Sequence, residues 1–118
     1  MDLGIRNKVA MVSGGSRGLG KQSAISLAGE GCRVSICGRG KEDLNKALVE
    51  IRGLGYDVVG IEADVGTLEG CEEFYKRTVD ELGPVDILVN NVGGTVGGRD
   101  FISATDQDWL DTININLF

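Results

Sequence analysis

The feature that most constrains this chain is an apolar run, Val9 to Val12, followed directly by the glycine-rich segment 13–20, which reads Ser-Gly-Gly-Ser-Arg-Gly-Leu-Gly. Glycine allows a tight turn and the close approach of a ligand because it has no Cβ atom. Where a strand passes through such a turn into a helix, the first helical N–H groups attract an anion, helped by the helix dipole. The segment therefore predicts a strand, a phosphate-binding loop and a helix.

Three further apolar runs alternate with segments of helical periodicity. The runs are Val34–Cys37, Val58–Ile61 and Val85–Val89, and the helical segments are 18–29, 41–52, 67–82 and a last one that begins at Thr105. The runs are nearly continuous, which is typical of strands buried on both faces of a parallel sheet. Strand–helix alternation predicts right-handed βαβ units. We therefore expect residues 1–118 to form one α/β domain, a Rossmann-type doubly wound parallel sheet of about four strands with flanking helices.

The apolar positions also predict which face of each helix is buried. The expected inward residues are Leu19, Ile25 and Ala28 in the first helix, Leu44, Leu48 and Ile51 in the second, Leu68, Tyr75, Val79 and Leu82 in the third, and Trp109, Ile113 and Leu117 in the last.

Composition excludes several classes of protein. The net charge of −6 argues against a nucleic-acid partner, and the absence of histidine argues against classical zinc sites and Ser-His-Asp catalysis. There is no signal-peptide pattern and no apolar run long enough to span a membrane. The three cysteines are expected to be buried free thiols, with no metal, in a protein of the reducing cytoplasm.

The glycine spacing discriminates between phosphate loops. It is G-x-x-x-G-x-G from Gly14 to Gly20, which differs from the dinucleotide fingerprint G-x-G-x-x-G. The nucleoside-triphosphate motif G-x-x-x-x-G-K-[ST] fits from Gly15 to Lys21 but fails at Gln22, where a hydroxyl would bind Mg²⁺. Neither motif accounts for the segment.

Four matches in order identify a family. The loop 13–20 is followed by Asp64-Val65 after the third run, by Asn90-Asn91-Val92-Gly93 after the fourth, and by Trp109 with Asn116 seven residues later. Taken together, these motifs cover most of the chain and resemble the classical short-chain dehydrogenase/reductase family. In its typical loop, Thr-Gly-x-x-x-Gly-Ile-Gly, Thr and Ile stand where this chain has Ser13 and Leu19.

The resemblance implies a dinucleotide site and an oxidoreductase that transfers a hydride between nicotinamide and a small carbonyl or alcohol substrate. A 3-oxoacyl-thioester reductase is among the candidates, and the parent protein is expected to be a homodimer or homotetramer. The implied cofactor-binding residues are Ser13, Gly14, Ser16, Arg17, Gly18, Leu19, Gly20, Arg39, Asp64, Val65, Asn91, Val92 and Gly93, and the implied catalytic residue is Asn116.

The family's catalytic Tyr-x-x-x-Lys is not in this sequence. Tyr56 is followed at the fourth position by Gly60, and Tyr75 by Val79. We therefore expect the chain to be the N-terminal, cofactor-binding part of a longer enzyme and to be inactive alone. A non-catalytic dinucleotide-binding module is the alternative, and a methyltransferase-type adenosyl binder is a weaker one.

Charge at the second strand predicts the choice of cofactor. NAD-preferring proteins place a carboxylate at the tip of this strand to bind the ribose hydroxyls. Here the tip is Gly38, followed by Arg39, and Arg17 enters from the glycine loop. Guanidinium groups pair well with a 2′-phosphate, so we expect NADP(H) to be preferred over NAD(H).

Overall fold

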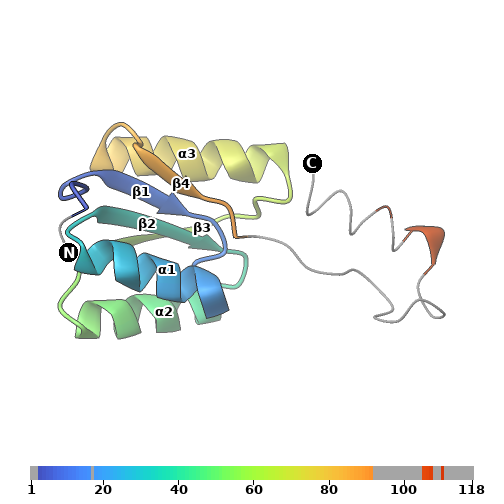
Figure 1. Cartoon of the computed structure of the whole chain (residues 1–118). Helices are drawn as coiled ribbons and strands as arrows, with labels where there is room; N and C mark the ends of the chain where they lie inside the picture. Colours follow the sequence, from blue (N-terminus) through green and yellow to red (C-terminus); the bar gives the residue numbers. More distant parts are fainter. Residues whose placement is uncertain (1–2, 17, 92–104, 108–109, 111–118) are drawn as a thin grey trace.

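The computed structural model of the protein describes residues 3–16, 18–91, 105–107 and 110. Strands and helices alternate in the order predicted (Figure 1). They are β1 (Val9–Val12), α1 (Gly18–Gly29), β2 (Arg33–Gly38), α2 (Lys41–Gly53), β3 (Val58–Glu62), α3 (Leu68–Leu82) and β4 (Ile87–Val89). Of the helix predicted from Thr105, only residues 105–107 and 110 are among those described.

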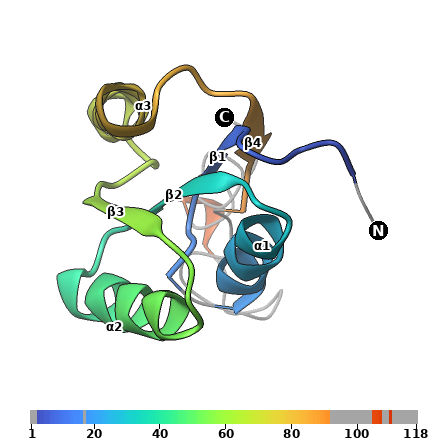
Figure 2. The ribbon, with the colours of Figure 1, turned by 90° about the vertical axis from the view of Figure 1, so that its left-hand side faces the viewer.

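The four strands form one parallel sheet in the order β3-β2-β1-β4. Helices α1 and α2 cover one face and α3 covers the other (Figures 1 and 2). Because the sheet is parallel, the carboxyl ends of all four strands lie at one edge, and the β1–α1 loop lies there too. The chain thus has the predicted Rossmann-type fold, and this edge is where such sheets bind ligands.

The core is divided by the sheet into two clusters. The cluster under α1 and α2 contains buried residues of β1 and β2 together with Ala24, Leu44 and Ile51. The smaller cluster under α3 contains Met11, Cys37, Ile61, Ala63 and Phe74. The face predicted for α2 is confirmed, since Leu44, Leu48 and Ile51 are all buried.

The face predicted for α3 is wrong at Leu68 and Tyr75, whereas Val79 and Leu82, which were also predicted to point inward, are partly buried. Leu68 and Tyr75 are 75% and 56% exposed, whereas Phe74 and Thr78 are buried. A shift of one position along a helix turns its face by about a quarter turn, and here the core selects the phenyl ring of Phe74. Leu19, predicted to point inward from α1, is also exposed, because it lies in the first turn beside the open edge of the sheet.

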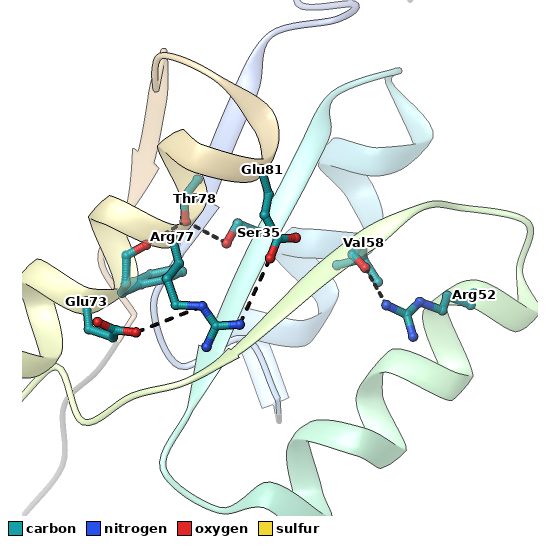
Figure 3. A network of polar contacts seen from close by, with 8 residues as sticks. Ser35, Arg52, Val58, Glu73, Arg77, Thr78 and Glu81 are labelled. Carbon is teal, nitrogen blue, oxygen red and sulfur yellow. Dashed lines mark hydrogen bonds and ion pairs between the residues drawn. The ribbon is translucent and has the colours of Figure 1, made fainter.

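Thr78 is buried because its hydroxyl group has polar partners (Figure 3). The Thr78 hydroxyl donates to the Phe74 carbonyl at 2.7 Å, so its proton is used, and Ser35 of β2 is left as the donor in their 2.8 Å contact. Both side chains are fully buried. The pair therefore joins α3 to the centre of the sheet with its hydrogen bonds satisfied.

Outside this buried pair, exposed charges line α3. Arg77 lies between Glu73 and Glu81 at 3.9 and 4.0 Å, and such solvent-exposed pairs contribute little to stability (Figure 3). On the other side of the sheet, Arg52 of α2 donates to the Val58 carbonyl at 2.9 Å.

The predicted fourth strand is shorter than its apolar run and is not buried on both faces. It begins at Ile87, and the preceding residue Asp86 is joined to Val9 of β1 twice: its backbone N–H donates to the Val9 carbonyl at 2.9 Å, and its carboxylate accepts the Val9 N–H at 3.0 Å. Leu88 is 57% exposed, because β4 is an outer strand of the sheet.

Cys71 is also exposed, so the prediction of buried thiols holds only for Cys32 and Cys37. Within the described residues, no helix is both long and apolar enough to cross a membrane.

Candidate functional site

The loop between β1 and α1 adopts the conformation that its glycines permit. Gly14 has φ +66° and Gly18 has φ +56°, both in the left-handed region that other residues avoid. Helix α1 begins at Gly18, and its first turn, residues 18–21, contains no acidic side chain. Since the first N–H groups of a helix lack partners within it, this end of α1 is suited to an anion.

Two other glycines are required by packing. A Cβ atom at Gly15 would lie 2.6 Å from the Ile36 side chain, and one at Gly20 would overlap the Gly14 carbonyl and the Asn91 amide. The loop is therefore pressed against β2 on one side and against the start of α1 on the other. Any larger residue at these two positions would clash with these neighbours and displace the loop.

Ser13 and Asn91 fix the loop to the end of β4. The Ser13 N–H and hydroxyl both donate to the Val89 carbonyl, at 3.0 and 3.2 Å, and the same hydroxyl accepts the Asn91 N–H at 3.0 Å. The Asn91 amide in turn donates to the Gly14 carbonyl at 3.4 Å. The structure thus brings together two predicted residues that are 78 positions apart and uses both to hold the loop.

The tip of β2 lies against the same loop. A Cβ atom at Gly38 would be 3.0 Å from the Ser16 hydroxyl, so the two residues are in direct contact. Arg39 follows and is exposed, and it has no ion pair with any residue that the structure describes. Lys21, by contrast, donates to Glu50 of α2 at 2.8 Å and is not a free charge for a ligand.

Asp64 and Val65 lie after β3 at the same edge. The Ala63 N–H donates to the Gly38 carbonyl at 3.1 Å, which joins this segment to the tip of β2. Asp64 Oδ1 accepts the Gly66 N–H at 2.9 Å, and the chain then turns into α3, whose first turn is capped by Thr67. Asp64 is exposed, and Val65 packs against the cluster that contains Phe74.

Four predicted site residues, Arg17, Val92, Gly93 and Asn116, lie outside the described residues. The other predicted residues lie along the carboxyl edge of the sheet, from Asp64 after β3 to Asn91 after β4. The two tyrosines lie elsewhere, Tyr75 exposed on α3 and Tyr56 before β3. Among the described residues, no group of His, Cys, Asp or Glu side chains could hold a metal ion.

Sequence reasoning missed Cys37, which lies under the loop. Its carbonyl accepts the Gly15 N–H at 3.1 Å. Burial raises the pKa of its thiol above the ordinary value, and a backbone hydrogen bond from Gly14 opposes that shift. No sequence signal separates this cysteine from an ordinary core residue. Its position after Ile36 in an apolar strand predicts only that its side chain is buried in the core.

Comparison with known proteins agrees with the geometry. Residues 8–118 match the family model for short chain dehydrogenases. The chain is 36% identical over 98% of its length to the (2S)-[(R)-hydroxy(phenyl)methyl]succinyl-CoA dehydrogenase subunit BbsD of Thauera aromatica. It is 39% identical over 94% of its length to a putative ketoacyl reductase of Streptomyces coelicolor.

A solved structure with the same arrangement is the F189W actinorhodin polyketide ketoreductase with NADPH. It superposes with a TM-score of 0.86 at 39% identity, over 94% of this chain. The chain spans 46% of the Thauera protein, 42% of the Streptomyces protein and 42% of the solved ketoreductase chain. It therefore corresponds to less than half the length of each of these proteins.

Proposed function

The chain belongs to the short-chain dehydrogenase family, and from this premise we propose that residues 1–118 form the NADP(H)-binding domain of an oxidoreductase that interconverts a carbonyl compound and an alcohol. The observation that carries the proposal is the glycine loop, which leads into the N-terminus of α1 and is fixed to the end of β4 by Ser13 and Asn91. A loop held on both sides in this way presents backbone N–H groups to a ligand without having to rearrange.

The pyrophosphate of the dinucleotide would bind at this loop and the start of α1. The first turn of α1 has no acidic side chain to compete with it, and Gly14 and Gly18 turn the backbone there. Of the remaining predicted residues, Asp64 and Val65 would lie against the adenine, and Val92 and Gly93 would lie toward the nicotinamide. The tight packing at Gly20 supports a loop that is shaped before the ligand arrives.

Three observations support a preference for NADP(H). Position 38 has no side chain, and its contact with Ser16 leaves little room for the carboxylate that would hold a ribose diol. Arg39 is exposed at the strand tip, and Arg17 of the loop would add a second guanidinium. One relative is known in complex with NADPH.

The bound cofactor would supply the hydride, and this chain's residues would orient it. The resemblance gives Asn116 the role of helping to hold a water linked to the family's lysine. That lysine and its tyrosine are not in this sequence, because neither tyrosine has a lysine at the fourth position after it. We propose that the chain by itself binds the dinucleotide but does not turn over a carbonyl substrate.

The names of the relatives favour a thioester or polyketide carbonyl as the substrate class. One acts on a succinyl-CoA derivative and two are ketoacyl or polyketide reductases. We carry this class over as a proposal for the parent enzyme, together with a homodimeric or homotetrameric assembly.

A non-catalytic dinucleotide-binding module is the second candidate, favoured by the missing Tyr-x-x-x-Lys. Measurable NADPH-dependent reduction of a ketoacyl thioester by the parent enzyme would exclude that candidate, whereas the same activity in the purified chain would refute both candidates.

Exchange of one charge tests the cofactor assignment. In Arg39→Asp, the lost contact to a 2′-phosphate and the new carboxylate should lower the ratio of NADPH to NADH affinity by about 10- to 100-fold, measured by titration calorimetry. Arg33→Asp is the matched control, because Arg33 is exposed at the opposite end of the same strand. An unchanged ratio in Arg39→Asp, or an equal change in both variants, would refute the role of Arg39.

A further inference from the structure

A cavity lies at the amino ends of β2 and β3, opposite the edge that carries the glycine loop. Its volume is about 440 Å³, within the range of roughly 300–1,000 Å³ that is usual for small-molecule sites. It is lined by the first residues of the two strands, Arg33 and Val58, and by residues near the ends of α1 and α2. None of the described residues predicted for the dinucleotide site lines it. The cavity is therefore separate from the site described above.

Much of the cavity lining is apolar. Ala28, Val34 and Val58 belong to the buried cluster under α1 and α2, and Val59 and Leu82 add half-buried apolar surface. Removal of apolar surface from water is favourable. The lining can therefore bind a hydrocarbon chain or ring.

Two guanidinium groups supply positive charge at the same cavity. Arg33 and Arg52 are both exposed, and neither forms an ion pair with another residue in the part of the chain that the structure describes. Arg52 donates one N–H to the Val58 carbonyl at 2.9 Å, as Figure 3 shows. This bond holds its guanidinium group at the start of β3 and leaves its other donors available, since arginine has five N–H groups.

The charges around the cavity favour a monoanion. Asp57 also lines it and is exposed, with no ion pair to Arg33 or Arg52. These three side chains together leave one net positive charge, and the carboxyl-terminal ends of α1 and α2 add partial negative charge. A dianion such as phosphate is therefore less suitable than a carboxylate, which also matches the planar guanidinium group in shape.

We propose that this cavity binds a small carboxylic acid with an apolar chain or ring. Its carboxylate pairs with the guanidinium groups of Arg33 and Arg52, and its apolar part lies against Val34 and Val58. The proposal does not rest on the proposed function, because the cavity and the glycine loop lie at opposite ends of the strands.

Titration of the whole chain with hexanoate, followed by NMR spectra of the backbone amides, tests the proposal. Gly31 and Gly55 line the cavity, whereas Gly14 and Gly18 belong to the glycine loop. We expect hexanoate to shift the signals of Gly31 and Gly55 with a dissociation constant on the order of 1 mM or lower, and to leave those of Gly14 and Gly18 unchanged. Hexanol has the same chain without the charge, and inorganic phosphate has charge without the chain. Each should bind at least about tenfold more weakly than hexanoate.

Charge-neutral variants test the two arginines. Arg33→Gln and Arg52→Gln should each weaken hexanoate binding by about tenfold, through the loss of charge-assisted hydrogen bonds. Lys46→Gln is the matched control, because Lys46 has the same charge and is exposed on α2 outside the cavity, and it should change the affinity by less than about twofold. Arg33→Gln keeps the bond from Arg52 to Val58, so the test of charge stands even if Arg52→Gln does not fold.

Each remaining outcome counts against the proposal. If millimolar hexanoate shifts neither Gly31 nor Gly55, or shifts only Gly14 and Gly18, the cavity is not its site. Hexanol that binds as tightly as hexanoate, or an equal effect of Arg33→Gln and Lys46→Gln, would refute the role of the arginines. Phosphate that binds in the cavity more tightly than hexanoate would refute the monocarboxylate class.

Discussion

Replacement of Ser13 by alanine tests how the loop is held. The Ser13 hydroxyl, on a residue that is only 6% exposed, donates to the Val89 carbonyl and accepts the Asn91 N–H, at 3.2 and 3.0 Å. Alanine keeps the backbone N–H bond from position 13 to Val89, so the carbonyl retains one donor. The Asn91 N–H loses its partner.

The magnitude follows from these contacts. Two neutral hydrogen bonds contribute about 1 kcal/mol each, and an N–H left without a partner in a partly buried place costs a similar amount. We expect the two lost hydrogen bonds to lower the free energy of unfolding by about 2 kcal/mol. The unpaired Asn91 N–H brings the upper limit of this loss to about 3 kcal/mol. For a domain of this size, a loss of about 2 kcal/mol corresponds to a decrease of roughly 8 °C in Tm.

Thermal unfolding followed by circular dichroism measures the effect. Ser26→Ala is the matched control, because Ser26 is exposed on α1 and alanine is a slightly better helix former. We expect Tm of this control to stay the same or to rise slightly. If Ser13→Ala unfolds at the same temperature as the control, the hydroxyl does not hold the loop to β4 and the reasoning fails.

Three further predictions concern the core and the charges. Thr78→Val should destabilise the protein by about 1–3 kcal/mol, because the buried Ser35 hydroxyl loses its acceptor, and adding Ser35→Ala should recover part of the loss in a denaturant titration. Lys21→Met should leave NADPH affinity within about twofold and cost less than about 1 kcal/mol, since Lys21 pairs with Glu50; a large loss of affinity would show that Lys21 binds phosphate instead. Burial raises the pKa of the Cys37 thiol, so the folded state holds this proton more tightly than the unfolded state does. The stability that results from this difference is complete below the ordinary thiol pKa of 9.0, and it decreases as the pH rises through the folded pKa. Equal slopes of stability against pH for the wild type and Cys37→Ala in that alkaline range would contradict this last prediction.

The sequence was sufficient for elements whose apolar pattern has one interpretation. The runs that form β1, β2 and β3 are short, apolar and rich in β-branched residues, and the structure has a strand at each of them. The face of α2 was predicted for a similar reason, since Leu44, Leu48 and Ile51 define a single stripe. In α3, Leu68 and Tyr75 made a second stripe beside that of Phe74, and only the shape of the core decides between them.

The site was predictable where backbone conformation requires a residue type and not where it depends on distant contacts. Gly14 and Gly18 have positive φ, which the glycine pattern anticipates. Nothing local predicts that Asn91 bonds to Ser13 and Gly14, because these contacts exist only after β4 has paired with β1. The burial of Cys37 could be predicted, but its contact with Gly15 could not.

The most direct test of the account is a crystal structure of the chain with NADPH. The account predicts that the pyrophosphate oxygens accept hydrogen bonds from backbone N–H groups of the loop and the first turn of α1, with the 2′-phosphate within ion-pair distance of Arg39. A dinucleotide bound away from the β1–α1 loop, for example at the amino ends of the strands, would contradict it.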